Sequence, residues 1–416
     1  MRIDRRGFLS LGVGAGLGWL TPAAQILARQ AEKADGPPSS LILLWLAGGP
    51  SQLETFDPHP DSASAGGTRA VETAAKGVRL ASGFERLAGE MGSVALVRSM
   101  TSKEGDHERG TYMLKTGYRP DPTVVHPSIG AICCHELPVG PADIPRHVSI
   151  LAGQWPGRGG FLGGEYDAFQ ADDPKGKLPD VSAFVPSERD ARRALDLDVV
   201  DRAFAHGRSA RVEATLHRKA VASARAMMTS EQLKAFDVGQ ESAETRAEYG
   251  DSPFGRGCLA ARRLIEVGVR CVEVTLDGWD SHVNNHEVHR RLVGVLDPAF
   301  SALLRDLRRR DLLDRTVVLC CGEFGRTPRI NPFGGRDHWT NGFSLALAGG
   351  GLNAGLALGE TDPEGVKDPA RPVPVQDVHA TVLSALGLDP ARENVAPVTG
   401  RPIKLSEGRP IRELLG

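Results

Sequence analysis

The sequence has few aromatic side chains and no marked excess of positive or negative charge. Both features narrow the class of protein that it can encode. Across 416 residues, 50 Lys and Arg stand against 52 Asp and Glu, which gives a formal net charge of −2. A nearly neutral chain gives no reason to expect nucleic acid or an anionic membrane surface as a partner. Aromatic residues make up only 5%, whereas glycine (49) and proline (28) are plentiful. This composition favours a loop-rich α/β protein over a helical bundle.

Cysteine is also scarce, and its placement does not resemble a disulfide framework. Four of the six cysteines form two adjacent pairs, Cys133–Cys134 and Cys320–Cys321. Neighbouring residues on a strand point to opposite faces, so the two cysteines of a pair would not both form disulfides with the same part of the chain. We therefore expect buried thiols, with room for one long-range bridge.

The N-terminal segment lacks the long apolar run of a durable membrane span. It carries paired arginines, Arg5 and Arg6, followed by Phe8, Leu9 and a short run rich in glycine and alanine. This arrangement is typical of a twin-arginine export signal, and an amphipathic first helix is the alternative. We expect residues 1–35 to be a signal segment and linker that engages the twin-arginine export machinery and directs the protein to the periplasm or cell surface. Because no clean A-x-A cleavage site is present, contact with the membrane through an uncleaved N-terminal segment stays open.

Apolar runs alternate with amphipathic helical patterns along the rest of the chain. The expected strands lie at 41–49, 93–100, 147–153, 270–276, 316–325 and 344–352, and the clearest helices at 258–269, 289–314 and 377–388. This alternation predicts an α/β fold, a three-layer sandwich with a mostly parallel central sheet. Residues 192–248 are charged and rich in alanine, which predicts a helical insertion. No second domain boundary is visible, so 36–416 is expected to form a single domain.

Polar side chains cluster directly after four of the expected strands, at 48–58, 101–118, 276–290 and 322–339. In α/β sheets, ligands bind at the carboxyl ends of the strands. These clusters supply Asp57, Asp106, His107, Asp277, Asp280, His282, Glu323, Arg326, Asp337 and His338. Carboxylates mixed with imidazoles suit a divalent ion such as Zn²⁺, Mn²⁺, Mg²⁺ or Ca²⁺. Together they predict one composite metal site, although any one of them is equally compatible with an ordinary polar loop.

Some of these residues carry specific alternatives. His282 follows two aspartates at a strand end, which favours a ligand. His286 and His289 begin the next helix among charged residues, and we expect them on a solvated face. Arg326 could hold an anionic substrate, because a guanidinium matches phosphate or sulfate, or it could form a structural ion pair with Glu323. The residues alone leave both roles open.

Seven segments together resemble a known family. They are GGPSQLETFDPHP, DHERGTYMLKTG, LDGWDSH, LDPAFSALLRDL, GEFGRTPRIN, GRDHW and ALAGGGL. The chain resembles the exported bacterial proteins of domain of unknown function 1501 over about residues 48–387, and GEFGRTP followed by GRDHW is the most distinctive part. That family has no agreed activity, but it is similar in turn to the alkaline phosphatase and sulfatase superfamily.

The superfamily resemblance implies an alkaline phosphatase-like fold and a set of metal ligands. The positions concerned are Asp277, Asp280, His282, Glu323, Asp337 and His338. Two departures are visible. Phe324 stands where the superfamily has a histidine at its second metal, and Ser51 stands near the place of the usual aspartate after the first strand. These departures count against a standard two-zinc phosphatase mechanism in this chain.

The resemblance also implies catalytic roles. Sulfatases place their nucleophile nine residues before a Thr-Gly pair, and here that position holds His107, as nucleophile, proton-transfer group or further ligand. Arg326 would neutralise an anionic ester. The implied function is an exported metal-dependent hydrolase of sulfate or phosphate esters, with sulfated glycans among the candidate substrates. The missing superfamily residues favour, as alternatives, a non-catalytic exported protein that binds glycans or a surface complex, or a protein whose metal only stabilises the fold.

Overall fold

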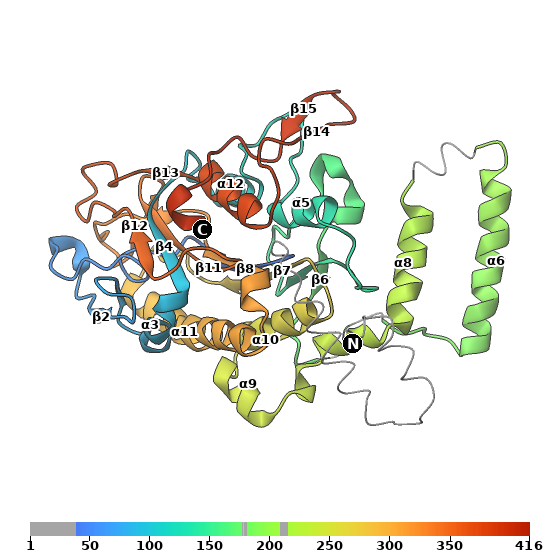
Figure 1. Ribbon diagram of the computed structural model, residues 1–416, viewed down its shortest axis with the longest axis horizontal. Helices are drawn as coiled ribbons and strands as arrows, with labels where there is room; N and C mark the ends of the chain where they lie inside the picture. The colour runs from blue at the N-terminus through green and yellow to red at the C-terminus, as the bar shows by residue number, and fades with distance from the viewer. Residues whose placement is uncertain (1–38, 177, 179–180, 209–214) are drawn as a thin grey trace, which may run out of the picture. The chain divides into compact units, whose positions relative to one another are not determined.

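The computed structural model describes residues 39–416, except 177, 179–180 and 209–214 (Figure 1). The expected signal segment, 1–35, lies outside the described residues, so the division into signal segment and single domain stays a prediction. In the part of the chain that is described, no helix has both the length and the apolar character needed to cross a membrane.

A nine-stranded sheet forms the centre, with the main order β12-β4-β11-β8-β1-β7-β5-β6 and β13 paired with β4. β1 (Ser40–Ala47) lies between β7 (Cys271–Asp277) and β8 (Thr316–Cys321), parallel to both. β11 (Phe343–Gly349) runs antiparallel to β8 and to β4 (Val94–Thr101). The other strands are β5 (His147–Ile150), β6 (Phe169–Ala171), β12 (Leu356–Leu358) and β13 (Val373–Pro374). The mostly parallel sheet is as predicted; the reversed direction of β11 is not visible in the sequence.

Helices cover both faces of this sheet, which gives the three predicted layers. They are α4 (His107–Thr116), α5 (Ile129–Glu136), α10 (Pro253–Glu266), α11 (Asn285–Arg309) and α12 (Val375–Ala385). Because successive strand residues point to opposite faces, β1 feeds two separate cores. Leu44 packs in the core beneath α10 and α11, and Leu43 packs in the core beneath α4, α5 and α12. Figure 1 shows α10 and α11 on one side of the strands and α5 and α12 on the other.

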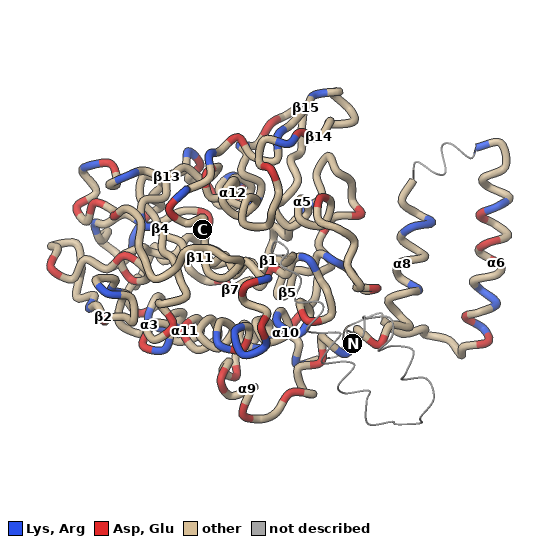
Figure 2. Tube along the Cα trace, in the orientation of Figure 1, with Lys and Arg blue, Asp and Glu red and all other residues tan. Residues whose placement is uncertain are grey.

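Three helices fall within or at the edges of the predicted helical insertion. They are α6 (Ser187–Ala205), α8 (His217–Thr229) and α9 (Ala243–Tyr249). Acidic and basic residues are interspersed along α6, whereas the charged residues of α8 are all basic (Figure 2). An ion pair between Arg225 and Asp190 and a hydrogen bond from Arg218 Nη2 to the carbonyl of Asp201 join these two helices. The stretch is therefore helical where it is described.

All six cysteines are described, free and buried, as predicted, and none forms a disulfide. Cys320 and Cys321 lie on β8 and enter opposite cores, which is the strand alternation that we expected. Cys133 and Cys134 lie in α5 instead. Burial raises the pKa of each of these thiols, so they behave as apolar side chains.

Candidate metal centre

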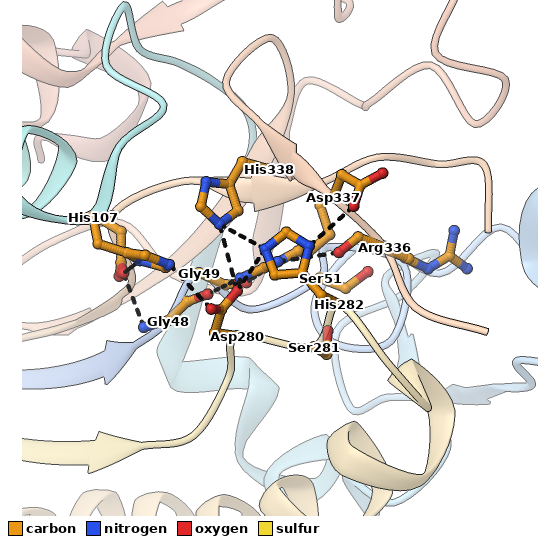
Figure 3. A network of polar contacts seen from close by, with 12 residues as sticks. Gly48, Gly49, Ser51, His107, Asp280, Ser281, His282, Arg336, Asp337 and His338 are labelled. Carbon is orange, nitrogen blue, oxygen red and sulfur yellow. Dashed lines mark hydrogen bonds and ion pairs between the residues drawn. The ribbon is translucent and has the colours of Figure 1, made fainter. Parts of the chain in front are cut away.

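The carboxyl ends of β4, β7 and β8 bring the predicted site residues together at one edge of the sheet (Figure 3). His107 is the first residue of α4, which follows β4, and Asp280 and His282 follow β7. Glu323 follows β8, and His338 opens the short strand β10 (His338–Trp339), which pairs with β9 (Gly325–Arg326). Segments far apart in the sequence therefore meet because parallel strands end at the same edge.

One ligand atom from each of His107, Asp280 and His338 lies within 4.8 Å of the others. The Asp280 carboxylate is at the centre of the group. Its oxygens lie 3.4 Å from His107 Nε2, 3.4 Å from His338 Nε2 and 3.1 Å from His282 Nε2. Figure 3 shows the three imidazole rings arranged around this carboxylate. The structure thus presents three ring nitrogens and a carboxylate to one point.

The opposite ring nitrogen of His107 and of His338 is held by an acceptor. His107 Nδ1 lies 2.7 Å from Glu323 Oε1, and His338 Nδ1 lies 2.7 Å from the carbonyl oxygen of Gly105. A carbonyl or an ionised carboxylate can only accept, so each Nδ1 carries a proton, and in the neutral ring each Nε2 keeps a lone pair. The hydrogen bond to Glu323 and its charge raise the pKa of His107, whereas burial lowers the pKa of His338. His107 Nε2 is buried and has no hydrogen-bond partner.

His282 is the third imidazole and follows the same pattern. Its Nδ1 lies 3.0 Å from Asp337 Oδ1, and its Nε2 lies 3.1 Å from His338 Nε2. Two unprotonated ring nitrogens at that distance repel unless a cation lies between or beside them. Histidine ligands of metals usually donate their other N–H to a carboxylate or carbonyl, as all three do here. The residues present therefore fit a bound metal ion.

Two of the predicted ligands contact the histidine side chains and do not face the point at which the Nε2 atoms converge. Glu323 and Asp337 contact the Nδ1 atoms of His107 and His282 instead of pointing at the central group. Asp277 is exposed at the end of β7, and its carboxylate accepts a hydrogen bond from the Gly278 amide. Among the described residues, no ion pair joins Asp277 to the three histidines. Of the two aspartates left open by the sequence, only Asp280 lies among the histidine nitrogens.

Arg326 is fully buried, with 0% of its side chain exposed, and its donors are occupied by the protein. It donates to the carbonyl oxygens of Gly48, Gly49 and Arg336 and to Asp280 Oδ1, the last at 2.5 Å. Burial opposes ionisation of Asp280, but the Arg326 guanidinium keeps the pKa of that carboxyl below its usual value. The expected ion pair with Glu323 is replaced by one with Asp280. The guanidinium has no exposed surface for a substrate, so we assign it to positioning Asp280.

Glycine at position 48 allows the first strand end to approach this group. Gly48 has φ +112°, and a Cβ there would lie 2.4 Å from the amide nitrogen of Asp280. Its own N–H donates to Glu323 Oε1 at 2.9 Å, the same oxygen that holds His107. The apolar run ending in Gly-Gly was the sequence signal for this contact, although its partner could not be named from the sequence.

The expectation of a solvated face was wrong for His289. This side chain is 1% exposed, its Nδ1 donates to the Asn285 carbonyl at 2.9 Å, and its Nε2 accepts from the Ser51 amide at 2.8 Å. Burial lowers the pKa of His289 to about 4, so the ring is neutral. His286 is half-buried, with Nδ1 3.8 Å from Glu54. The helix begins earlier than expected, at Asn285, and this turns His289 toward the loop after β1.

The two remaining aspartates from the strand-end clusters have structural roles. Asp106 caps α4, accepting a hydrogen bond from the Arg109 amide at 3.1 Å. Asp57 is buried and accepts from the amide and the hydroxyl of Thr361, at 2.8 and 2.6 Å. Neither carboxylate takes part in the ion pairs around Asp280, so both belong to the scaffold of the site.

Glu323→Gln should weaken metal binding by about 10–100-fold, the usual effect of removing a partner that orients a ligand histidine. The amide can still accept from His107 and Gly48, but it lacks the negative charge that makes the imidazole a stronger donor to a metal. Competition titration of Zn²⁺ against a fluorescent chelator measures the effect. Glu108→Gln, an exposed neighbour of His107, is the control. Parental affinity in the Glu323 variant would contradict the assignment.

A family model described as "Protein of unknown function (DUF1501)" matches residues 38–415. A search of curated proteins finds no match. Similar solved structures include the lipoteichoic acid synthase LtaP from Listeria monocytogenes, at 10% identity and TM-score 0.41, covering 88% of this chain and 74% of that one. The PsFucS1 sulfatase from Pseudoalteromonas sp. has 12% identity, TM-score 0.40 and coverage of 88% and 70%. A TAB5 alkaline phosphatase mutant with Mg bound has 11% identity, TM-score 0.37 and coverage of 85% and 99%.

These structural likenesses are distant, whereas the family match covers almost the whole chain. It includes every motif from which the family was predicted. The protein therefore belongs to the family described as DUF1501.

Proposed function

We propose that this protein is an exported, metal-dependent hydrolase of sulfate or phosphate esters. One observation carries the proposal: three imidazole Nε2 atoms converge on the Asp280 carboxylate while their Nδ1 atoms are held by acceptors. In the neutral rings these Nε2 atoms have lone pairs and nothing to donate to one another, so a bound cation would stabilise their arrangement. The superfamily resemblance of the motifs supports the reaction class.

His107, Asp280 and His338 would hold the ion, with His282 beside them. A set dominated by imidazole favours Zn²⁺ or another transition ion over Mg²⁺ or Ca²⁺, which prefer oxygen ligands. In such a site the bound ion polarises an ester oxygen or lowers the pKa of a bound water. Glu323 and Arg326 would then act through others, Glu323 by orienting His107 and Arg326 by fixing Asp280.

His282 is the histidine best placed for proton transfer. Its side chain is 44% exposed, the most accessible of the three, and the Asp337 carboxylate holds its Nδ1–H. Its Nε2 can accept a proton from an attacking water and return it to the leaving oxygen of the ester. The carboxylate–imidazole pair would stabilise the protonated ring between these two events.

A second candidate function follows from the same residue. His282 Nε2 lies 3.1 Å from both Asp280 Oδ1 and His338 Nε2, which is close enough for it to be a fourth ligand. Four protein ligands would complete a tetrahedral shell, as in structural zinc sites, and leave no position for a substrate. The protein would then be a non-catalytic binding protein whose metal stabilises the fold.

Metal content and ester turnover of the purified protein separate these functions. The enzyme should hold about one Zn²⁺ or Mn²⁺, hydrolyse p-nitrophenyl sulfate or phosphate, lose activity with chelator and recover it with the ion. His282→Ala should keep the metal and lose turnover. Loss of the metal in that variant, with no turnover in the parent, would favour the structural role. A folded parent that takes up none of Zn²⁺, Mn²⁺, Mg²⁺ or Ca²⁺ would refute both.

Export through the twin-arginine route is part of the proposal, with residues 1–35 as its signal. It would place the hydrolase in the periplasm or at the cell surface, where sulfated glycans and other anionic esters are accessible to it. Fusing residues 1–35 to a reporter that is active only after export tests this part. A reporter that stays inactive would refute the proposed export and would not affect the proposal of ester hydrolysis.

A further inference from the structure

A pocket of about 190 Å³ lies against α4, the helix that begins with His107. Thr111, Tyr112 and Lys115 line it from the helix, and Trp155 lines it from the loop after β5. His107, Thr111 and Lys115 follow one another at intervals of four residues, so they lie along one side of α4. The pocket therefore lies further along the same side of α4 as His107, and Thr111 is one helical turn from that histidine.

Thr111 is the first sign that this pocket receives a ligand. Its side chain is buried, with 2% exposed, and its Oγ1 has no hydrogen-bond partner. A threonine inside a helix commonly donates to the carbonyl four residues earlier, as Thr116 does to Tyr112 at 2.7 Å. Thr111 makes no such bond, although an unpaired buried hydroxyl is costly. A ligand with its own hydroxyl groups would satisfy it.

The floor of the pocket carries no net charge. Lys115 Nζ is buried and donates to Glu273 Oε1 at 2.6 Å and to the Trp155 carbonyl at 2.7 Å. Ser149 donates to the same glutamate oxygen at 3.1 Å. The ammonium is thus neutralised and also ties the Trp155 loop to the sheet. Glu108 and Arg158 also line the pocket; both are exposed and carry opposite charges, so the charged residues around the pocket sum to zero. This balance favours a neutral ligand over a second anion.

The walls and the size limit the ligand further. Tyr112 Oη lies 2.9 Å from His126 Nδ1 and accepts from the His126 amide at 2.7 Å, so this phenol offers the pocket mainly its apolar surface. Trp155 adds a second aromatic wall. Aromatic side chains with nearby hydroxyl groups suit an amphipathic ring. Drug-sized ligands occupy roughly 300–1,000 Å³, so this pocket has room for about one ring.

We propose that this pocket binds a single neutral sugar ring, adjacent to the point at which its ester group is cleaved. This inference rests on the proposed function, because it names the organic part of the ester: a glycan residue carrying a sulfate or phosphate. The ring lies between Tyr112 and Trp155, and one of its hydroxyl groups bonds to Thr111 Oγ1.

Binding of methyl galactoside and of N-acetylglucosamine to the whole protein tests the pocket without any turnover. Calorimetry with and without metal should detect one site for at least one of the two sugars. Thr111→Val should weaken binding by about 3–10-fold, as expected for one lost hydrogen bond, and Trp155→Ala by more. Thr316→Val is the matched control, since Thr316 Oγ1 is also buried and unpartnered but lies on β8 and lines no part of this pocket. It should bind sugar as the parent does.

Failure of the pocket and failure of the hydrolase give different results. If p-nitrophenyl esters are hydrolysed but neither sugar binds, the sugar pocket is refuted and the hydrolase stands. If the sugars bind and both pocket variants lose binding, but no ester turns over, the pocket stands and the hydrolase does not. Equal losses in Thr316→Val and Thr111→Val would also refute the pocket, because the effect would then belong to stability. Metal content should be parental in all three variants.

Discussion

Asp280→Asn should abolish stoichiometric metal binding, whereas Asp277→Asn, three residues earlier, should leave it unchanged. Asp280 is the carboxylate on which three Nε2 atoms converge, and Asp277 lies exposed at the end of β7. Losing a partner outside the ligand set already costs about 10–100-fold in affinity, so losing a ligand should cost more than about 100-fold. Metal content after dialysis against a weak chelator measures the difference.

The asparagine was chosen to separate metal binding from folding. Its amide oxygen can still accept from the buried Arg326 guanidinium, which alanine would leave without an acceptor at that position. Circular dichroism and thermal unfolding should show that both variants are folded. His338→Ala provides a second, independent loss of a ligand. The assignment fails if Asp277→Asn loses the metal while Asp280→Asn keeps it.

Much of this site could be predicted from the sequence, because residues that follow different parallel strands lie close together at one edge of the sheet. The pattern of each buried strand indicated where that strand ends. The polar residues after β4, β7 and β8 were therefore expected at the same edge of the sheet. His282 and His338 lie 56 residues apart, yet their Nε2 atoms are 3.1 Å apart. The family motifs pointed to the same residues, and His107 entered the site through the spacing of its motif.

Finer choices depended on geometry that no pattern encodes. Strand alternation carries Asp277 out to solvent, and the buried Trp279 and the close approach of Gly48 then bring Asp280 back. A helix start at Asn285 instead of four residues later decides whether His289 faces solvent or the core. Element boundaries are the least certain part of any sequence interpretation, and here a few residues decide the role of a side chain.

The buried ion pair between Arg336 and Glu54 contacts the residues that position the site, and it was not predicted from the sequence. Arg336 is 0% exposed; its Nε lies 3.1 Å from Glu54 Oε2 and its Nη2 2.8 Å from Oε1. Its carbonyl oxygen accepts from Arg326 Nη1 at 3.1 Å, and Arg326 in turn holds Asp280. Burial alone would raise the pKa of Glu54, but the Arg336 charge lowers it to about 2. The carboxylate is thus ionised in the folded protein under all ordinary conditions.

Glu54→Gln should lower the free energy of unfolding by about 3–5 kcal/mol, because it leaves a fully buried guanidinium without its counter-charge. Urea unfolding at pH 7 measures this. Glu360→Gln, on a side chain that is 64% exposed, is the control and should change stability by less than about 0.5 kcal/mol. A loss of less than about 1 kcal/mol in the Glu54 variant would show that the pair adds little.

The pH dependence of unfolding gives an independent measure of the same pair. The pKa of Glu54 falls from 4.5 to about 2 on folding, so its contribution is complete above pH 4.5 and is lost as the pH falls toward 2. The difference corresponds to about 3 kcal/mol. The parent should therefore lose stability across this range more steeply than Glu54→Gln, and the two curves should converge near pH 2. Metal affinity should weaken in the variant as well, because the Arg336 carbonyl accepts a hydrogen bond from Arg326, which in turn holds Asp280. If the two stability curves run parallel and metal affinity is unchanged, the Glu54–Arg336 ion pair does not support the metal site.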